Sequence, residues 1–141
     1  MTRSLLAAAF AMTAQQVSAV CTVATLPVTF GAYSPLSAQN VDGAGTVDIV
    51  CVPASAYTIS LSPGGGSYVS RSMAKGADRL NYNLYTNSSR TIVWGDGTGV
   101  TVTVSGNAAT ASHTVYGRIA GSQNAARLGA YTDSITVTVT F

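Results

Sequence analysis

The sequence predicts an all-β protein that folds as one antiparallel β-sandwich. Apolar residues recur at every second position in segment after segment, as they do in half-buried strands. Glycine, proline, asparagine and aspartate separate these segments, so the chain turns about every 8–12 residues. Only 9% of the 141 residues are charged, with seven Lys plus Arg, five Asp and no Glu. Because solvated helices usually carry many Glu, Lys and Arg residues, helical bundles are disfavoured.

The alternating segments follow one another along most of the chain. In each, apolar residues alternate with Thr, Ser, Asn or Asp, which predicts about seven or more short strands. They are Val23 with 28–30, then 46–51, 57–61, 80–84, 100–104, 111–115 and 135–141. Turn signals between them include 42–43, 63–66, 95–97 and 106–107. The only place where a short helical turn fits is 73–75, and the length suits one domain, expected over 20–141.

The first residues predict a secretory signal peptide over 1–19. Arg3 gives a positive start, residues 5–12 form an apolar run, and small residues precede a cleavage point near Ala19. The run is far shorter than the roughly 20 residues that cross a bilayer, and no second long apolar stretch predicts a membrane anchor. The alternative is an amphipathic N-terminal helix. We expect an exported protein with a net charge too small for an electrostatic nucleic-acid binder.

The two cysteines predict one disulfide. Cys21 and Cys51 both lie in the exported part, where oxidising conditions favour such a bond. Zinc binding is the alternative, but the chain has no CxxC pair and a single histidine. No metal or other cofactor is therefore expected.

Catalytic patterns are weak. His113 is the only histidine and lies in an expected strand, which indicates a surface or edge-strand residue rather than a catalytic base. The five Asp residues are scattered along the sequence, whereas a glycosidase needs two carboxylates close together. The segment Gly95–Gly99 resembles a glycine-rich binding loop but lacks the following Lys-Ser/Thr, so a β-turn is expected. We therefore expect no enzyme activity.

The aromatic residues leave a second function open. They are Tyr82, Tyr85, Trp94, Tyr116 and Tyr131. Rings of this kind stack on sugars, although they also pack in β-sheet cores. A secreted carbohydrate-binding or coat β-sandwich protein that does not polymerise is thus the alternative to the function considered next.

A series of short motifs resembles the spore coat protein U domain family. The series runs in order through nearly all of the expected mature chain. It consists of Cys21, Phe30-Gly31 with Tyr33, Gly45-Thr46-Val47 to Cys51, Arg71-Ser72-Met73, 80–85 (LNYNLY), 94–97 (WGDG), 116–119 (YGRI), 129–133 (GAYTD) and the strand that ends at Phe141. The same domain occurs in subunits of archaic chaperone–usher pili.

The resemblance implies an immunoglobulin-like sandwich that lacks its last strand. It further implies a structural subunit of a surface pilus, completed by a strand from a periplasmic chaperone and then, at an outer-membrane usher, by a strand from the neighbouring subunit. The expected acceptor groove is lined by Ile135, Val137, Val139 and Phe141, and Cys21–Cys51 joins the first strand to the second. Such a subunit passes through the periplasm to the cell surface and supports adhesion or biofilm formation.

The N-terminus departs from this pattern. A donor strand needs roughly ten alternately apolar residues before the first cysteine, because alternate side chains fill successive pockets. Cleavage after Ala19 leaves only Val20 in that position, and 13–20 (TAQQVSAV) is mostly polar or small. Three interpretations remain open: an upstream start codon, a subunit that accepts a strand without donating one, and a secreted homologue that does not polymerise.

Overall fold

The structure is a computed structural model that describes residues 17–141. Most of the expected signal peptide therefore lies outside the described residues, and 17–19 lead directly into the first strand. Six strands are present: β1 (Val20–Thr29), β2 (Val41–Leu61), β3 (Arg71–Lys75), β4 (Asp78–Tyr85), β5 (Val104–Ile119) and β6 (Val137–Thr140). Residues 17–141 contain no helix, hence none long enough to cross a membrane.

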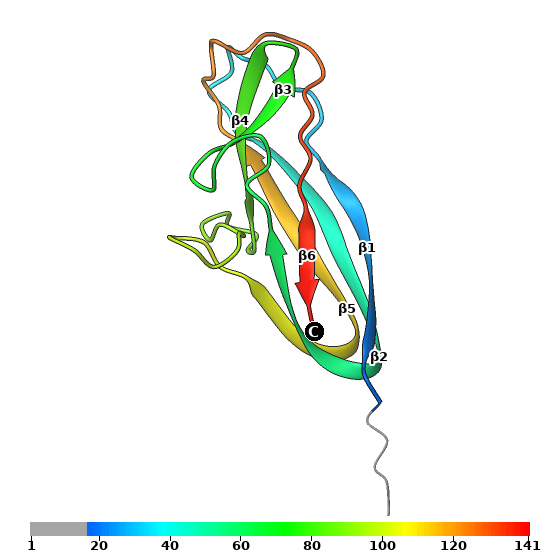
Figure 1. The fold of residues 1–141 in the computed structure, drawn as a ribbon. Coiled ribbons are helices and arrows are strands. Elements are labelled where there is room, and N and C mark those ends of the chain that lie inside the picture. The colour runs from blue at the N-terminus through cyan, green and yellow to red at the C-terminus, as the bar shows by residue number, and fades with distance from the viewer. Residues whose placement is uncertain (1–16) are drawn as a thin grey trace, which may run out of the picture.

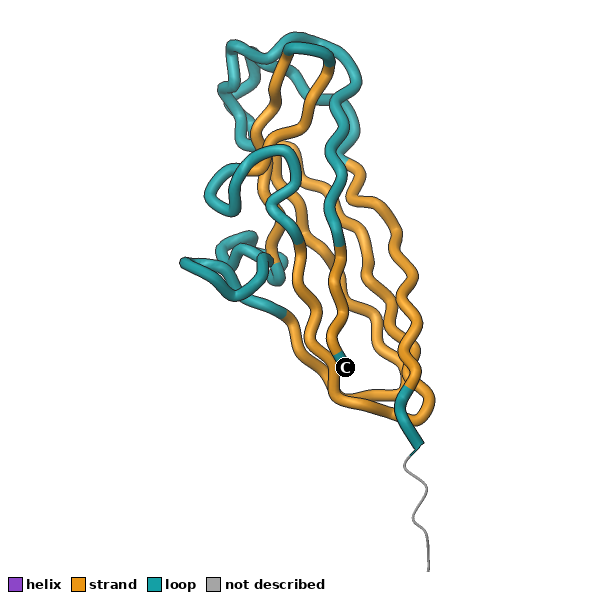
Figure 2. Tube along the Cα trace, in the orientation of Figure 1, coloured by secondary structure: helices purple, strands orange, loops and turns teal. Residues whose placement is uncertain are grey.

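The six strands form one antiparallel sheet that curls into a half-barrel. Its order is β1-β2-β5-β4-β3, and β6 pairs with the second half of β2. Figure 1 shows β6 lying in front of the long strands, with β1 beside it and the loops gathered at the far end and along one side. Figure 2 shows the same trace as strand and loop only. The expected all-β antiparallel fold is confirmed, and the curl brings distant parts of the sheet face to face.

Strand β2 is much longer than the sequence pattern predicts. It includes both 46–51 and 57–61, which the alternation pattern predicts as two separate strands. The pairing with β5 runs through both parts but shifts register between Val50 and Ser55, where the strand bends. One bent strand therefore replaces two expected strands and supports both walls of the half-barrel.

Other expectations are wrong in detail, and the turns expected at 42–43 and 106–107 lie inside β2 and β5. Residues 73–75 belong to strand β3, since Met73 and Lys75 pair with Leu80 and Asp78 of β4 across a tight hairpin. Residues 100–103 are mostly loop, and β5 begins only at Val104. Gly97 and Gly99 adopt positive φ, and Thr101 N–H donates to the carbonyl of Thr98, so the chain is still turning there.

The core lies inside the curl. Its buried hydrophobic residues come from every strand except β1 and β6, together with Trp94 and Ala126 from loops. Trp94 is completely buried, and its indole N–H donates to the carbonyl of Ile59 at 3.1 Å. The side chains of β1 and β6 pack against this core only partly. That difference locates the candidate site.

Candidate functional site

The candidate site is an apolar groove between β1 and β6. One edge of β2 pairs with β5 almost throughout, while its other edge pairs first with β1, over 44–52, and then with β6, over 58–61. Because β2 bends between these parts, β1 and β6 become the two rims of one opening (Figure 1). Among the described residues, each rim strand pairs with β2 alone. Both therefore keep one edge with unpaired backbone groups facing the opening.

Burial shows that the inner faces of the rim strands lack a cover. Val23 of β1 pairs with Ile49 of β2, yet Val23 is 44% exposed while Ile49 is 1% exposed. On the other rim, Val137 is half-buried although its partner Leu61 is 2% exposed. These side chains face the core but still contact solvent. Apolar surface of this kind is costly to leave in water.

The groove has a volume of about 800 Å³. Its floor is formed by buried side chains of β2, β3, β4 and β5, including Val47, Leu80 and Val115. One rim consists of 25–33 and the other of 128–133 with Ile135 and Val137. Apolar atoms dominate this lining, so the site suits an apolar occupant and offers little for catalysis.

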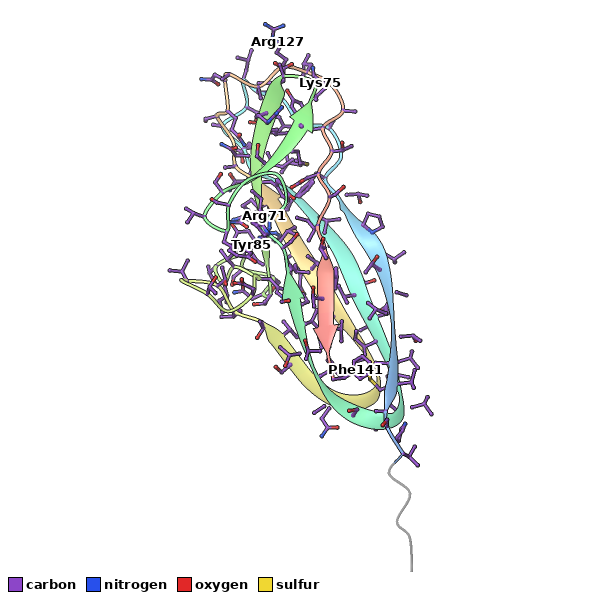
Figure 3. All side chains as sticks on the ribbon, in the orientation of Figure 1. Arg71, Lys75, Tyr85, Arg127 and Phe141 are labelled. Carbon is purple, nitrogen blue, oxygen red and sulfur yellow. A yellow bond between two sulfur atoms is a disulfide. The ribbon has the colours of Figure 1, made fainter. Side chains whose placement is uncertain are left out.

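The four residues expected to line an acceptor groove lie in different positions. Ile135 and Val137 line the cavity. Val139 packs partly against the core opposite Ile59 but is outside the cavity lining. Phe141 follows the end of β6 and is 57% exposed; Figure 3 shows it at the lower end of that strand.

The disulfide joins Cys21 to Cys51 and so attaches β1 to β2. The two cysteines are direct cross-strand partners, and Cys51 is buried. This confirms the pairing expected from the sequence. One rim of the groove is thus covalently attached to the strand that supports both rims.

Glycines allow the second half of β1 to lie close to the sheet. A Cβ at Gly117 would meet Phe30 Cζ at 2.6 Å and Val28 Cγ1 at 2.7 Å. A Cβ at Gly45 would meet the carbonyl oxygen of Leu26 at 2.5 Å. The β1–β2 register also shifts between Leu26 and Thr29. The missing side chains therefore make room for Val28 and Phe30 at the rim.

A buried arginine joins the start of β3 to β4 and to the loops that follow β2 and β4. Arg71 is 0% exposed and donates to Ser62 O, to Trp94 O at 2.7 Å and to Asn83 Oδ1 at 2.6 Å. Its guanidinium also lies over the ring of Tyr68, 5.5 Å from the centroid. Burial lowers the pKa of Arg71, but guanidinium groups remain charged in proteins. We call Arg71, Ser62, Asn83 and Trp94 the Arg71 hub.

A second polar contact lies between the hub and the groove. Tyr82 Oη donates to Asp133 Oδ2 at 2.7 Å, and Asp133 Oδ1 accepts the N–H groups of Gly65 and Ser134. Burial, followed by the hydrogen bond to Asp133, raises the pKa of the Tyr82 hydroxyl. The carboxylate therefore ties β4, the 62–67 loop and the segment before β6 together.

The catalytic candidates from the sequence are not brought together. His113 is half-buried, and its Nε2 lies 2.9 Å from Tyr57 Oη, which is a packing contact within the curl. Asp96 caps the turn at Gly95–Gly99 by accepting the N–H of Thr98 at 3.0 Å, which confirms the expected turn. Within residues 17–141 no three His, Cys, Asp or Glu side chains are placed to hold a metal.

The five aromatic residues considered for sugar stacking mostly face inward. Trp94 and Tyr82 are buried, so neither presents a ring face to solvent. Tyr131 is half-buried, and its hydroxyl donates to the carbonyl of Arg127. Tyr85 and Tyr116 are half-buried neighbours on β4 and β5. No exposed aromatic platform forms among them.

Sequence reasoning missed most of the groove. It selected only the C-terminal rim and omitted 25–33 and 128–133, which supply the rest of the two rims. The 128–133 segment has no alternation, so no periodic signal could identify it. For 25–33 a signal existed, because Pro27 within an apolar run is typical of an edge strand.

Comparisons with known proteins agree with this geometry. The profile of the Spore Coat Protein U domain (SCPU) matches residues 6–138. Protein U of Myxococcus xanthus is 33% identical over 126 residues, which cover 79% of this chain and 70% of that protein.

A structural match comes from the CsuC-CsuE chaperone-tip adhesion subunit pre-assembly complex of the archaic chaperone-usher Csu pili of Acinetobacter baumannii. The TM-score is 0.59 at 25% identity, over 89% of this chain. The chain corresponds to only 40% of that chain's length. Together with the profile match over most of the sequence, these likenesses establish that the chain belongs to the Spore Coat Protein U domain family.

Proposed function

We propose that this protein is a structural subunit of a surface pilus of the archaic chaperone–usher type, and that it is assembled by insertion of a strand into the groove. The observation that carries the proposal is the pair of uncovered rims, β1 and β6, on either side of an apolar cavity of about 800 Å³. An inserted strand would pair with both free edges. It would also cover Val23, Ile135 and Val137.

The open strand edges and the apolar floor of the groove favour an extended peptide over a small ligand. Two open strand edges offer rows of backbone donors and acceptors, which an extended chain satisfies in a regular way. Alternate side chains of the same chain point to one face, where they would enter the apolar floor. A compact small molecule would bury the apolar surface but leave the edges unpaired.

The proposed partners follow from the same groove. A periplasmic chaperone would supply the strand first, and a neighbouring subunit would replace it at an outer-membrane usher. The structural likeness to a chain from a chaperone–tip subunit complex supports this order. The protein would then pass through the periplasm to the cell surface and support adhesion or biofilm formation without a catalytic role.

Two neighbouring residues of β6 provide a matched test. Val137 faces the groove, whereas Thr138 is exposed on the opposite face of the same strand. Co-expression with a chaperone of this pilus type is expected to yield a stable complex with the unchanged protein and with Thr138→Asp. Val137→Asp is expected to lose the complex, because a carboxylate would be buried against the inserted strand. The amount of co-purified chaperone measures the effect.

Two results would contradict the proposal. The first is a stable, monomeric domain that binds neither a chaperone nor an alternating apolar peptide. The second is equal chaperone recovery with Val137→Asp and Thr138→Asp. The N-terminus of the exported protein, measured by mass spectrometry, tests the predicted cleavage near Ala19 and shows whether a donor segment precedes Cys21.

A further inference from the structure

The groove continues beyond the ends of the two rim strands, β1 and β6. β1 ends at Thr29 and β6 begins only at Val137, yet 30–33 and 128–133 also line the cavity. We call the part between β1 and Ile135–Val137 the strand-edged half. The part between 30–33 and 128–133 is the loop-edged half.

Backbone pairing cannot continue into the loop-edged half in the same way. Thr132 already exchanges two backbone hydrogen bonds with Ala74 of β3, at 2.8 and 3.1 Å. The carbonyl of Leu128 accepts from Lys75 Nζ. This rim is thus held toward β3, and its backbone groups at these points are already satisfied.

The lining of the loop-edged half is aromatic. Phe30 and Tyr82 pack edge to face with ring centroids 5.9 Å apart, while Tyr33 and Tyr131 contribute from the two rims. Met73 adds a thioether, which makes favourable contacts with aromatic rings. The strand-edged half, by contrast, is lined by aliphatic residues such as Val47, Leu61 and Val115.

The polar groups of the loop-edged half already have partners. Tyr82 Oη is bonded to Asp133, and Tyr131 Oη is bonded to the backbone of Arg127. Lys75 Nζ lies 3.5 Å from Asp78 Oδ2 and 5.4 Å from the centroid of the Tyr131 ring. Asp133, the carboxylate that lines this half, already accepts from Gly65, Tyr82 and Ser134, so a neutral occupant is favoured.

We infer that the loop-edged half is a separate subsite for one bulky, neutral aromatic side chain at the end of the inserted strand. The occupant would pair by backbone with the strand-edged half and place an aromatic ring among Phe30, Tyr82 and Tyr131. The inference rests on the proposed function, since it assumes the inserted strand. Tyr131 and Val137 are six positions apart, so about 20 Å of extended chain spans both halves.

Synthetic peptides test the subsite. The basic peptide has about nine residues in the pattern TTVTVTVTT, so that its valines and its two terminal threonines share the face that points to the floor of the groove. Two further peptides carry phenylalanine in place of one terminal threonine, at one end or the other. The oxidised full chain is refolded with each peptide, and affinity is measured from the peptide dependence of the unfolding midpoint.

One of the two phenylalanine peptides is expected to bind about tenfold to a hundredfold more tightly than the basic peptide, because an aromatic ring becomes buried. Leu128→Asp is expected to abolish that gain without weakening the basic peptide. Leu128 lines this half and is 72% exposed, so the substitution leaves the core unchanged. Leu36→Asp is the control, since Leu36 is 87% exposed and absent from the cavity lining.

The outcomes distinguish failure of the aromatic subsite from failure of the proposed function. Binding of the basic peptide with no gain from phenylalanine at either end would overturn the subsite and leave the proposed function standing. A gain that survives Leu128→Asp would also overturn it. Failure of every peptide to bind a folded chain would contradict the proposed function itself.

Discussion

The Arg71 hub and the groove lie in the same half-barrel but satisfy their chemical groups in opposite ways. In the hub, Arg71 is fully buried and its donors reach three acceptors on Ser62, Asn83 and Trp94. Along the rim strands, Val23 and Val137 face the core yet contact solvent, and each rim strand keeps an unpaired edge. The closed region is polar and fully paired, whereas the open region is apolar and incomplete.

This difference shows how one sheet can be stable although its two rim strands each keep an unpaired edge. Buried polar groups that are all satisfied hold loops 62–67 and 94–95 rigidly against the strands. The chain therefore does not need to collapse across the opening to gain stability. The hub thus stabilises the wall formed by β3, β4 and these loops, while the groove stays open.

The largest expected effect comes from removing the hub. Arg71→Met leaves the carbonyls of Ser62 and Trp94 without a donor and removes the charge-assisted hydrogen bond to Asn83 Oδ1, which keeps only the N–H of Leu84. Each unpaired buried acceptor costs about 1–3 kcal/mol, so we expect a loss of about 3–5 kcal/mol in the free energy of unfolding. Urea unfolding monitored by Trp94 fluorescence measures it. Arg79→Met is the control, because Arg79 is exposed and donates only within its own hairpin.

A smaller effect is expected from the disulfide that anchors one rim. Replacing both Cys21 and Cys51 by Ser opens a loop with a sequence separation of 30, which is worth about 3 kcal/mol in the chain-entropy model. Hydrogen exchange should accelerate in β1 more than in β3 or β4, because the bond attaches only β1. Equal protection of β1 in the oxidised protein and the double variant would show that strand pairing alone holds this rim.

The cross-strand pair Ile49 and Val23 shows how much stability the uncovered inner face of β1 lacks. Ile49→Ala removes a buried side chain and is expected to cost about 2–5 kcal/mol, whereas Val23→Ala, across the ladder, should cost under about 1 kcal/mol. With a bound strand, the cost of Val23→Ala should rise, since the side chain then becomes buried. Unfolding midpoints of both variants, with and without an alternating peptide, test this. An unchanged cost for Val23→Ala with bound peptide would mean that the strand does not cover it.

The smallest effect concerns an ion pair on the outer face. The hydrogen bond from Arg118 lowers the pKa of the Asp42 carboxyl, and Arg90 adds to the shift. A lowered pKa stabilises the fold above the unfolded pKa of about 3.9, and the stabilisation disappears as the pH falls through the folded pKa. Because the Asp42 side chain is 37% exposed, Asp42→Asn should cost only a few tenths of a kcal/mol at pH 7. The free energies of unfolding of the two proteins should converge as the pH falls through the lowered folded pKa of Asp42; a constant gap would exclude the ion pair as the cause.

The sequence predicts the closed parts of the fold better than the open ones. Alternation locates 46–51, 57–61 and 80–84 correctly and 135–141 in part, where β6 covers Val137–Thr140, because each has one face against the core. It cannot show that the first two belong to one bent strand, since a turn and a bend contain similar residues. It also fails at 71–75, where the hairpin with β4 imposes strand geometry that the short segment does not suggest by itself.

The hub and the loop-edged rim have no periodic pattern in the sequence for a physical reason, although the family motifs include most of their residues. Arg71, Asn83 and Trp94 lie far apart in the sequence and meet only after the sheet curls. The rim at 128–133 is held by Thr132, which bonds to Ala74, and by Asp133, which bonds to Gly65. Such long-range contacts leave no periodic pattern. The disulfide, by contrast, can be predicted from the sequence. The expected exported part contains only two cysteines, so each has a single possible partner within the chain.

The bend in β2 has a mechanical consequence. Both rims hydrogen-bond to this one strand, β1 before the bend and β6 after it, and Cys51 lies at the end of the first part. In the fibre that we propose, a pulled strand inserted between the rims would load these β-ladders along their length, so that many hydrogen bonds resist together. The Cys21–Cys51 bond would prevent β1 from sliding past β2. Traction would then be transmitted through a single continuous strand instead of being divided between two layers.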